Sequence, residues 1–376
     1  MAGIYIHIPF CKTRCAYCDF YSTTHEEWKQ QYIDAVCKEL HQRKDYLKGE
    51  TVRTIYIGGG TPSQLGAAQI GRLLQTIHSV FPIDKQPEIT LEANPDDLTD
   101  EYIEQLKSTP VNRISMGIQT FNDATLRILN RRHTAQEACQ AVNRLRKKGF
   151  GNISIDLIYG LPGEDLKQWE ANLQQAIALN VEHISAYHLT YEEGTPLYRM
   201  LQKGMVSEVS EEHSLMCFNT LIDTLQQAGF QHYEISNFCK PGKHSRHNSS
   251  YWQGIAYLGC GAAAHSFDGA SRQWNIADIK AYIQGIEKDE PCYEIEALDN
   301  ATRYNEYIMT GLRTSHGISL DEVAARYGQP LADTCQKSAT PHLESGKLIT
   351  EENRIKLSRE GIFVSDAIIC DLMVLT

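Results

Sequence analysis

The chain contains 376 residues, of which 42% are hydrophobic and 22% charged, and its formal net charge is −11. That length allows one large domain and a smaller one. The negative charge argues against broad nucleic-acid binding, which needs a basic surface, and against retention on anionic lipid. No apolar run approaches the roughly 20 residues of a membrane helix, and Met1–Phe10 lacks the features of a signal peptide. We therefore expect a cytoplasmic protein with no membrane span and no nucleic-acid partner.

Six short runs rich in β-branched and apolar residues predict strands, at Ile4–Ile8, Thr54–Ile57, Glu88–Glu92, Arg113–Gly117, Ile153–Ile158 and His183–Leu189. Stretches with helical spacing lie between most of them, including Glu27–Lys44, Ala67–Val80 and Thr134–Lys148. Strands that alternate with helices predict an α/β fold with a parallel sheet. We expect a partial (β/α)6 TIM-like barrel, and an open doubly wound sheet is the alternative.

The alternation ends near Pro196, so we divide the chain into a barrel (1–205), a connecting region (206–300) and a C-terminal domain (301–376). In the connecting region we expect a helix, a strand and a polar loop, at Glu211–Ala228, Tyr233–Phe238 and 240–253. In the C-terminal domain we expect two helices and two paired strands, at Ile318–Tyr327, Leu331–Ser345, Leu348–Leu357 and Gly361–Ile369. This order predicts a small α+β domain that is winged-helix-like.

Three of the eleven cysteines lie close together, in the segment Cys11-Lys-Thr-Arg-Cys15-Ala-Tyr-Cys18. In a reducing compartment such a cluster indicates a metal site rather than disulfides. Thiolates are the usual ligands of iron–sulfur clusters, which normally take four, so three cysteines leave one iron open to a small molecule. Zinc is the alternative, but the second close pair of ligands typical of structural zinc is not evident.

The cysteine loop directly follows the first predicted strand, and in this setting it resembles the signature of the radical S-adenosylmethionine (SAM) superfamily. The resemblance implies that the three cysteines hold a [4Fe–4S] cluster. It also implies that the open iron chelates the amino and carboxylate groups of SAM, and that one electron splits SAM into methionine and a 5′-deoxyadenosyl radical. A cofactor of this kind performs the chemistry, and the protein positions it.

Further motifs are similar to the oxygen-independent coproporphyrinogen oxidase (HemN) group: Tyr5–Cys11, Gly58-Gly-Gly-Thr-Pro62, Glu92-Ala-Asn-Pro95, Gly117–Phe121 and Asp156–Gly163. By position in these motifs, the resemblance implies that SAM is contacted by Tyr5, Tyr17, Gly59, Gly60, Thr61, Glu92, Gln119, Arg131 and Asp156.

The types of these residues suit the role. Glycine has no Cβ, so Gly59 and Gly60 let the backbone approach a ligand closely. Glu92 and Asp156 can accept hydrogen bonds from an amino group or ribose hydroxyls, and Arg131 can pair with a carboxylate. In parallel α/β folds the site lies at the carboxyl ends of the strands, so we expect these residues to meet there.

Two features separate the chain from the oxidases. The oxidases carry a further cysteine two residues after the triad, where this chain has Phe20, which argues against oxidase activity. The segment Arg246-His-Asn-Ser-Ser-Tyr-Trp252 contains HNxxYW, a motif typical of the HemW haem chaperones. The resemblance implies haem binding by His247, Tyr251 and Trp252. Imidazole is a common axial haem ligand, and aromatic rings can stack on a porphyrin.

We expect the loop around His247 to present this ligand near the barrel opening that holds the cluster. Nearby cations, at Lys240, Lys243 and Arg246, are candidates to meet the haem propionates.

The first functional hypothesis is a haem chaperone that binds haem and transfers it to an acceptor protein, with a SAM-bound [4Fe–4S] cluster. The alternatives are an oxygen-independent coproporphyrinogen III oxidase and a radical SAM enzyme on an unknown substrate, both of which need an electron donor. A winged-helix regulator is disfavoured because acidic residues outnumber basic ones from Gly317 onward. For the assembly, a monomer and a homodimer are both open.

Overall fold

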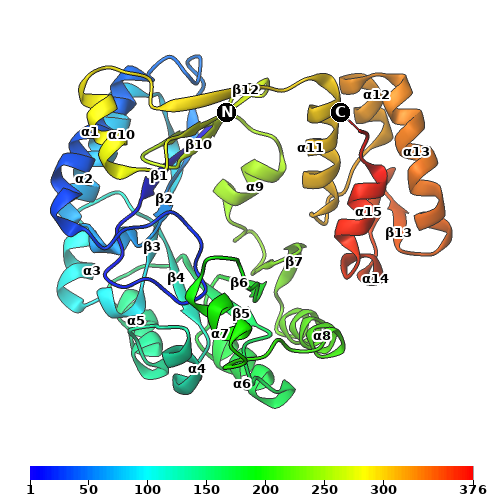
Figure 1. Cartoon of the computed structure of the whole chain (residues 1–376), viewed down its shortest axis with the longest axis horizontal. Coiled ribbons are helices and arrows are strands. Elements are labelled where there is room, and N and C mark those ends of the chain that lie inside the picture. The colour runs from blue at the N-terminus through cyan, green and yellow to red at the C-terminus, as the bar shows by residue number, and fades with distance from the viewer. Residues whose placement is uncertain (376) are drawn as a thin grey trace.

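A computed structural model describes residues 1–375 and shows a curved parallel sheet at the centre of the larger body (Figure 1). Six parallel strands lie side by side in chain order: β1 (Ala2–Ile8), β2 (Val52–Gly59), β3 (Ile83–Ala93), β4 (Arg113–Gln119), β5 (Ile153–Tyr159) and β6 (His183–His188). A doubly wound sheet reverses its strand order at a switch point. These six strands never reverse, so the prediction of a partial barrel is confirmed.

Helices surround this sheet, and most of them lead into the next strand (Figure 1). They are α1 (Lys29–Gln42), α2 (Ala67–Val80), α3 (Asp100–Leu106), α4 (Asp123–Ile128), α5 (Ala135–Lys147), α6 (Leu166–Ala178) and α7 (Pro196–Gln202). The bounds of α2 agree with the predicted range. The first predicted helix instead starts as a short 3₁₀ turn, Glu26–Trp28, before α1 begins.

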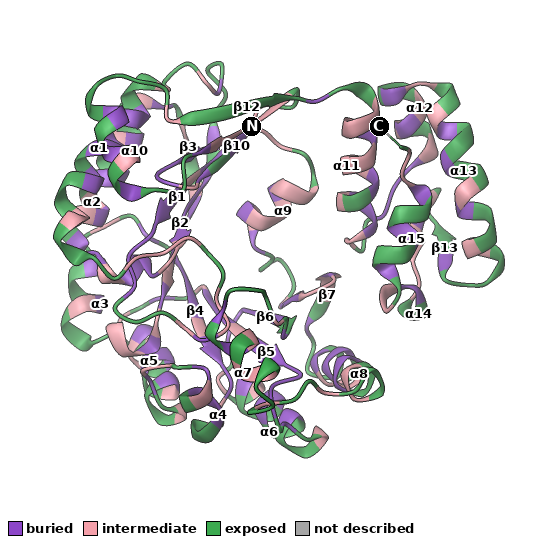
Figure 2. Cartoon of the chain, in the orientation of Figure 1, coloured by how far each residue is buried: buried purple, intermediate pink, exposed green. Residues whose placement is uncertain are grey.

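Alternate residues of each strand pack under these helices. On β1 they are Ile4, Ile6 and Ile8, all with no exposed surface. Successive side chains of a strand point to opposite faces, so the residues between them face the inside of the barrel. Burying one such aliphatic side chain contributes roughly 1.5–3 kcal/mol. The resulting core runs through the whole barrel wall, seen as the buried strands of Figure 2.

The connecting region extends the same sheet at both edges. The strands β7 (Gln231–Glu234) and β8 (Asn237–Cys239) continue it beyond β6, whereas β9 (Tyr257–Cys260), β10 (His265–Phe267), β11 (Ser271–Asn275) and β12 (Tyr293–Ala297) continue it beyond β1. Its helices are α8 (Glu211–Gln227), α9 (Arg246–Trp252) and α10 (Ile279–Glu287).

Two local predictions for this region were wrong. The expected strand Tyr233–Phe238 is a tight hairpin of β7 and β8. The expected loop 240–253 contains the helix α9, because the Ser245 side chain caps its start by accepting a hydrogen bond from the Asn248 backbone N–H.

The C-terminal domain has a hydrophobic core of its own, separate from that of the barrel. Its elements are α11 (Asn300–Leu312), α12 (Leu320–Tyr327), α13 (Gln329–Glu344), β13 (Leu348–Glu351), β14 (Arg354–Leu357), α14 (Arg359–Ile362) and α15 (Ser365–Leu372). Three helices followed by a hairpin agree with the winged-helix-like prediction.

The predicted strand pairing in this domain was wrong. The run Leu348–Leu357 folds on itself as the hairpin β13–β14, with Glu352 and Asn353 at positive φ in its turn. Gly361–Ile369 is helical instead, since Ile368, Ile369 and Leu372 share one buried helix face that packs on the domain core.

Candidate functional site

The inside of the barrel is lined by polar and aromatic side chains that occupy every second strand position. They are Tyr5 and His7 on β1, Thr54 and Tyr56 on β2, Thr90 and Glu92 on β3, Arg113 and Ser115 on β4, Ser154 and Asp156 on β5, and His183 and Ser185 on β6. Most barrels of this kind fill their interior with apolar branched residues. A polar interior in this chain therefore indicates a site for a polar ligand rather than a packing core.

The three cysteines lie on the loop that leaves β1, as predicted. All three are free thiols; Cys11 is buried, whereas Cys15 and Cys18 are partly exposed. Across residues 1–375, no three His, Cys, Asp or Glu side chains are grouped closely enough to hold one metal ion. A [4Fe–4S] cluster takes one thiolate per iron, so its ligands need not converge on a single point. A loop with three thiols supplies ligands for three of the four irons of such a cluster.

Polar groups from the segments that follow two other strands, β2 and β4, contact these thiols. The Thr61 hydroxyl donates to Cys11 Sγ at 3.4 Å, and Arg131 Nη1 donates to Cys15 Sγ at 3.3 Å. A Cβ on Gly60 would lie 2.9 Å from Cys11 Sγ and 2.9 Å from the Pro9 carbonyl carbon. Such a contact is too short for any side chain, so the glycine is needed here for close packing. Hydrogen bonds to a sulfur atom stabilise its thiolate form, and they also change the reduction potential of a cluster bound to that sulfur.

Glu92, one of the predicted SAM contacts, lies inside the barrel at the end of β3. Its carboxylate accepts hydrogen bonds from the Tyr56 hydroxyl at 2.7 Å and from the Gly59 backbone N–H at 3.0 Å. Burial raises the pKa of Glu92 to about 7, although these two hydrogen bonds oppose the rise. A carboxyl group that is half ionised near neutral pH responds strongly to a bound cation.

The other predicted SAM contacts surround the same end of the barrel. Burial raises the pKa of Asp156 on β5 to about 6, and its charge adds to the rise in the pKa of Glu92, so these two carboxyl groups are neighbours. Gln119 ends β4 with a positive φ of 71°. Tyr17 lies beside Arg131 and Cys15, and the Tyr5 hydroxyl is hydrogen-bonded to His7 at 3.0 Å.

Arg131 is already engaged by the protein. Its Nη2 donates to Asn94 Oδ1 at 2.6 Å and also to the Gly117 carbonyl oxygen, while its buried Nε has no partner among the described residues. A buried N–H without an acceptor is costly unless a ligand supplies one. The nine predicted SAM contacts therefore lie between the middle of the strands, where Tyr5 and Asp156 stand, and their carboxyl ends, which carry the cysteine loop.

The HNxxYW segment lies at the opposite end of the barrel, so the expectation that it adjoins the cluster opening was wrong. It forms the helix α9, which lies between the sheet and the C-terminal domain (Figure 1). The His247 backbone N–H donates to Glu88 Oε1 at 3.0 Å, and His247 Nδ1 is hydrogen-bonded to the Thr54 hydroxyl at 2.8 Å. Thr54, near the start of β2, is paired with Glu88, which lies four residues before Glu92 on β3.

His247 itself is enclosed. Its exposed fraction is 0%, and its second ring nitrogen, Nε2, is hydrogen-bonded to the Tyr251 hydroxyl at 2.8 Å. Burial lowers the pKa of His247 to about 3, and the Arg113 charge acts in the same direction. The imidazole is therefore neutral, as an iron ligand must be, but Tyr251 must release Nε2 before that atom can bind a metal.

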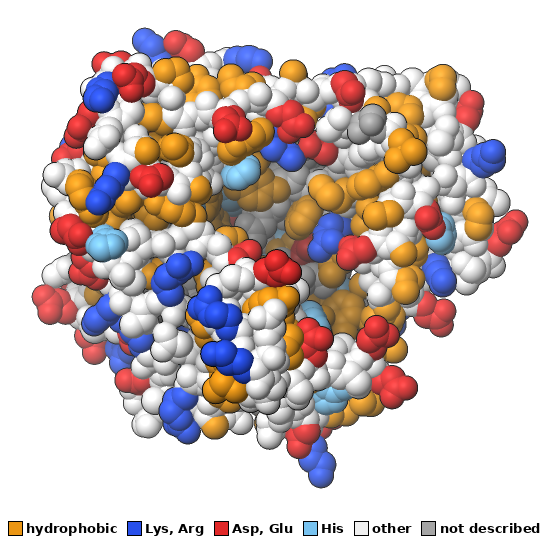
Figure 3. All heavy atoms as spheres, viewed as in Figure 1, with side chains coloured by type: hydrophobic (Ala, Val, Ile, Leu, Met, Phe, Trp, Pro, Cys, Tyr) orange, Lys and Arg blue, Asp and Glu red, His pale blue; other side chains and the backbone are white. Residues whose placement is uncertain are grey.

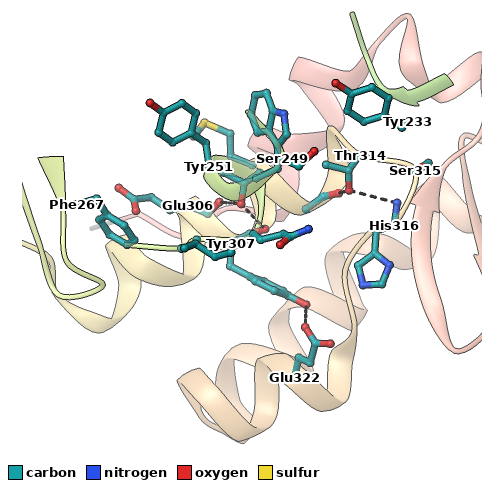
Figure 4. Close-up of a pocket in the computed structure, with 18 of the residues that line it drawn as sticks. Tyr233, Ser249, Tyr251, Phe267, Glu306, Tyr307, Thr314, Ser315, His316 and Glu322 are labelled. Carbon is teal, nitrogen blue, oxygen red and sulfur yellow. Dashed lines mark hydrogen bonds between the residues drawn. The ribbon is translucent and has the colours of Figure 1, made fainter. Parts of the chain in front are cut away.

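A cavity of about 880 Å³ lies between α9 and the C-terminal domain, and Figure 3 shows the molecule hollowed there. Tyr251 and Phe267 line it from the barrel side, whereas Tyr307 and His316 line it from the C-terminal domain (Figure 4). Trp252 of α9 also lines it. This size lies within the range of about 300–1,000 Å³ that is usual for ligand pockets. Two of the three predicted haem contacts therefore face a cavity, and the third lies directly behind Tyr251.

The cations expected beside this segment do not line the cavity. Lys240 Nζ instead donates to the Asn180 carbonyl oxygen at 2.8 Å, and Arg246 Nη1 donates to the Gln86 carbonyl oxygen at 3.0 Å. Through these hydrogen bonds, both side chains hold α9 and the segment before it against the barrel.

Tyr56 joins the two ends of the barrel and was missed from the sequence. Its hydroxyl donates to Glu92, while its ring stacks on His247 with centroids 5.1 Å apart and planes 26° apart. A continuous column therefore runs from Glu92 through Tyr56 and His247 to Tyr251 at the cavity wall. The available signal was the alternation of Ile55 and Ile57 with Thr54 and Tyr56, which places a tyrosine inside the barrel.

Comparisons with known proteins agree with this geometry. A family model of the radical SAM superfamily matches residues 5–176, and a model of the HemN C-terminal domain matches residues 298–364. The solved structure of coproporphyrinogen III oxidase (HemN) from Escherichia coli, a radical SAM enzyme, superposes with a TM-score of 0.86 at 24% identity, over 99% of this chain and 90% of that one. Fold and cysteine loop together define a radical SAM protein.

The sequence relatives are more specific. "Heme chaperone HemW" of Bacillus subtilis (strain 168) is 35% identical over 96% of each chain. "Heme chaperone HemW" of Lactococcus lactis subsp. lactis (strain IL1403) is 35% identical over 95% of this chain and 93% of that one. This chain belongs to the HemW family of haem chaperones. No helix within residues 1–375 is long and apolar enough to cross a membrane.

Proposed function

We propose that this protein is a haem chaperone, which binds haem and passes it to an acceptor protein. The observation that carries the proposal is the position of α9, which presents Tyr251 and Trp252 to a cavity of about 880 Å³ and holds His247 directly behind them. The names of its full-length relatives support the same function.

His247 is the proposed axial ligand. Its imidazole is neutral and is held in one orientation by the hydrogen bond from Nδ1 to Thr54. Among the described residues, the Tyr251 hydroxyl is the only hydrogen-bond partner of Nε2. Rotation of the Tyr251 side chain toward the cavity would open Nε2 to iron. The phenol ring would then be free to contact the porphyrin, as would Trp252.

We propose that Cys11, Cys15 and Cys18 hold a [4Fe–4S] cluster and that SAM binds beside it. Such a cluster supplies one-electron chemistry when SAM is bound. The chain's own contribution is positioning: Thr61 and Arg131 contact the thiols, and Glu92 and Asp156 offer carboxylates. In a chaperone, binding of SAM at this site would alter the haem site through the column of side chains that includes Tyr56 and His247.

The test is an anaerobic visible-absorption titration with haem on cluster-reconstituted protein. We expect a saturable Soret shift in the wild type that is lost in His247→Ala. The matched controls are His244→Ala and His316→Ala, because both histidines line the same cavity and neither ring has a hydrogen bond among the described residues. A shift that survives in His247→Ala but is lost in a control variant would assign the ligand elsewhere. No shift in the wild type would refute the chaperone function.

A radical SAM enzyme is the second candidate, and the polar barrel interior that faces the cysteine loop favours it. Oxidative decarboxylation of coproporphyrinogen III is opposed by Phe20, whose side chain is 67% exposed where the oxidases have a cysteine. The test is anaerobic incubation with SAM, a reductant and coproporphyrinogen III, beside an authentic oxidase. Conversion of the porphyrinogen would establish the enzyme. Its absence, with conversion by the authentic oxidase, would remove this substrate.

A further inference from the structure

The C-terminal domain presents two unpaired cations to the cavity. Arg303 of α11 and Arg326 of α12 both line it, and both lie near the Tyr327 phenol. Within residues 1–375 neither of them forms an ion pair with a carboxylate. Arg272 and Arg354, which also line the cavity, are paired with Glu306 at 2.6 Å and Glu322 at 2.7 Å.

The surroundings of these two arginines hold them only weakly. The Arg326 guanidinium lies over the rings of Tyr307 and Tyr327, 5.3 Å and 5.2 Å from their centroids. Arg303 makes two long hydrogen bonds of 3.4 Å, to the Asp299 carbonyl oxygen and to Asn300 Oδ1. Stacking on an aromatic face leaves the N–H groups of a guanidinium free to bind a carboxylate in its own plane. Each arginine therefore has donors to offer to an anion.

The barrel side of the cavity carries an aromatic and apolar patch, formed by Trp252, Ile255, Tyr257 and Phe267 from α9 and the strands beyond it. Polar groups also line this side, among them Ser249, Gln253 and Arg272, which is paired with Glu306. The Trp252 indole N–H is buried and has no acceptor among the described residues. One wall thus suits a flat apolar body, and the other suits carboxylates. A ligand that fits both must be a flat aromatic molecule with anionic groups along one edge, which describes an iron tetrapyrrole with two propionates.

We propose that the C-terminal domain supplies the carboxylate-binding half of the haem site, with Arg303 and Arg326 binding the propionates and the Trp252 wall receiving the macrocycle. This inference rests on the proposed chaperone function and gives the C-terminal domain a part in it. Haem bound in this way bridges the two domains. The local cations are required because the chain as a whole, with a net charge of −11, repels a dianion.

The experiment compares haem with haem dimethyl ester, whose propionates carry no charge, on full-length reconstituted protein. The variants are Arg303→Gln, Arg326→Gln and the double variant. Lys337→Gln is the control, since Lys337 is an exposed cation of α13 in the same domain that does not line the cavity. We expect each arginine variant to bind haem about two- to fivefold more weakly, as for an exposed ion pair. The ester should bind all variants alike.

The outcomes separate this inference from the function on which it rests. Wild-type protein that shows no Soret shift contradicts the chaperone function itself. A wild-type shift that depends on His247, with affinities unchanged in the double variant, refutes only the role of the arginines. Equal losses for haem and its ester would mean that the substitutions disturb the domain rather than a propionate contact, and that result also refutes the proposal. A fall in haem affinity with rising salt, present in the wild type and absent in the double variant, would support it.

Discussion

The hydrogen bond from Tyr56 to Glu92 provides a direct test of the site at the carboxyl end of the barrel. Replacing Tyr56 with Phe removes the hydroxyl that donates to Glu92 at 2.7 Å and keeps the ring that stacks on His247. This hydrogen bond favours the ionised carboxylate and so opposes the effect of burial, which raises the pKa of Glu92 to about 7. Without the bond, the pKa of Glu92 must rise further.

The size of the effect follows from the strength of the bond. A hydrogen bond to a charged group contributes roughly 1.5–3 kcal/mol, and about 1.4 kcal/mol corresponds to one pKa unit. The pKa of Glu92 should therefore rise by about one to two units, to roughly 8–9. At about pH 7.5 the ionised fraction then falls from about three quarters to between about a quarter and a thirtieth. If the ionised form holds the SAM amino group, SAM should bind about three- to twentyfold more weakly.

The assay is equilibrium binding of SAM to anaerobically reconstituted protein across a pH range. Glu92 is charged above its pKa, so wild-type affinity should rise between about pH 6 and pH 8, and the Tyr56→Phe curve should lie at higher pH. Near pH 9 the two proteins should agree to within about twofold. Tyr102→Phe is the control, because it removes a hydroxyl that donates to the Leu65 carbonyl oxygen away from the barrel interior. A Tyr56→Phe curve whose midpoint lies at the same pH as that of the wild type would refute the reasoning.

Two further substitutions test the barrel. In Gly60→Ala the new Cβ would lie 2.9 Å from Cys11 Sγ, so reconstituted protein should lose most of its iron and sulfide. Gly66→Ala is the control and should retain both, because its Cβ would meet nothing within 4 Å. Equal iron and sulfide contents in the two variants would contradict the packing argument. In Trp169→Phe the indole donor to the Cys217 carbonyl oxygen is lost from a fully buried position. The free energy of unfolding should fall by roughly 2–4 kcal/mol, seen as an earlier urea transition, and an unchanged midpoint would contradict this estimate.

Much of the barrel was predictable because its signals are local. The β-branched runs and helical spacings needed only neighbouring residues, and parallel strands connected by helices necessarily place their carboxyl ends together. For that reason the cysteine loop, Glu92, Arg131 and Asp156 were expected at one end, where they are found. The run Leu348–Leu357 shows the limit of such signals, since an apolar alternation does not reveal that Glu352 and Asn353 turn the chain back on itself.

The sequence by itself determined the cysteine loop and the individual strands, since each depends on residues close together in the chain. The parallel order of the strands then predicted that the polar site residues meet at one end of the barrel. Only the tertiary structure decided where the HNxxYW segment lies. His247 meets Thr54 across 193 residues, and no local pattern records such a contact. The same is true of the cavity, where Arg303 and Arg326 approach Trp252 only because the C-terminal domain docks beside α9. Spacing along the chain shows which chemistry is available, but packing of distant segments decides which groups act together.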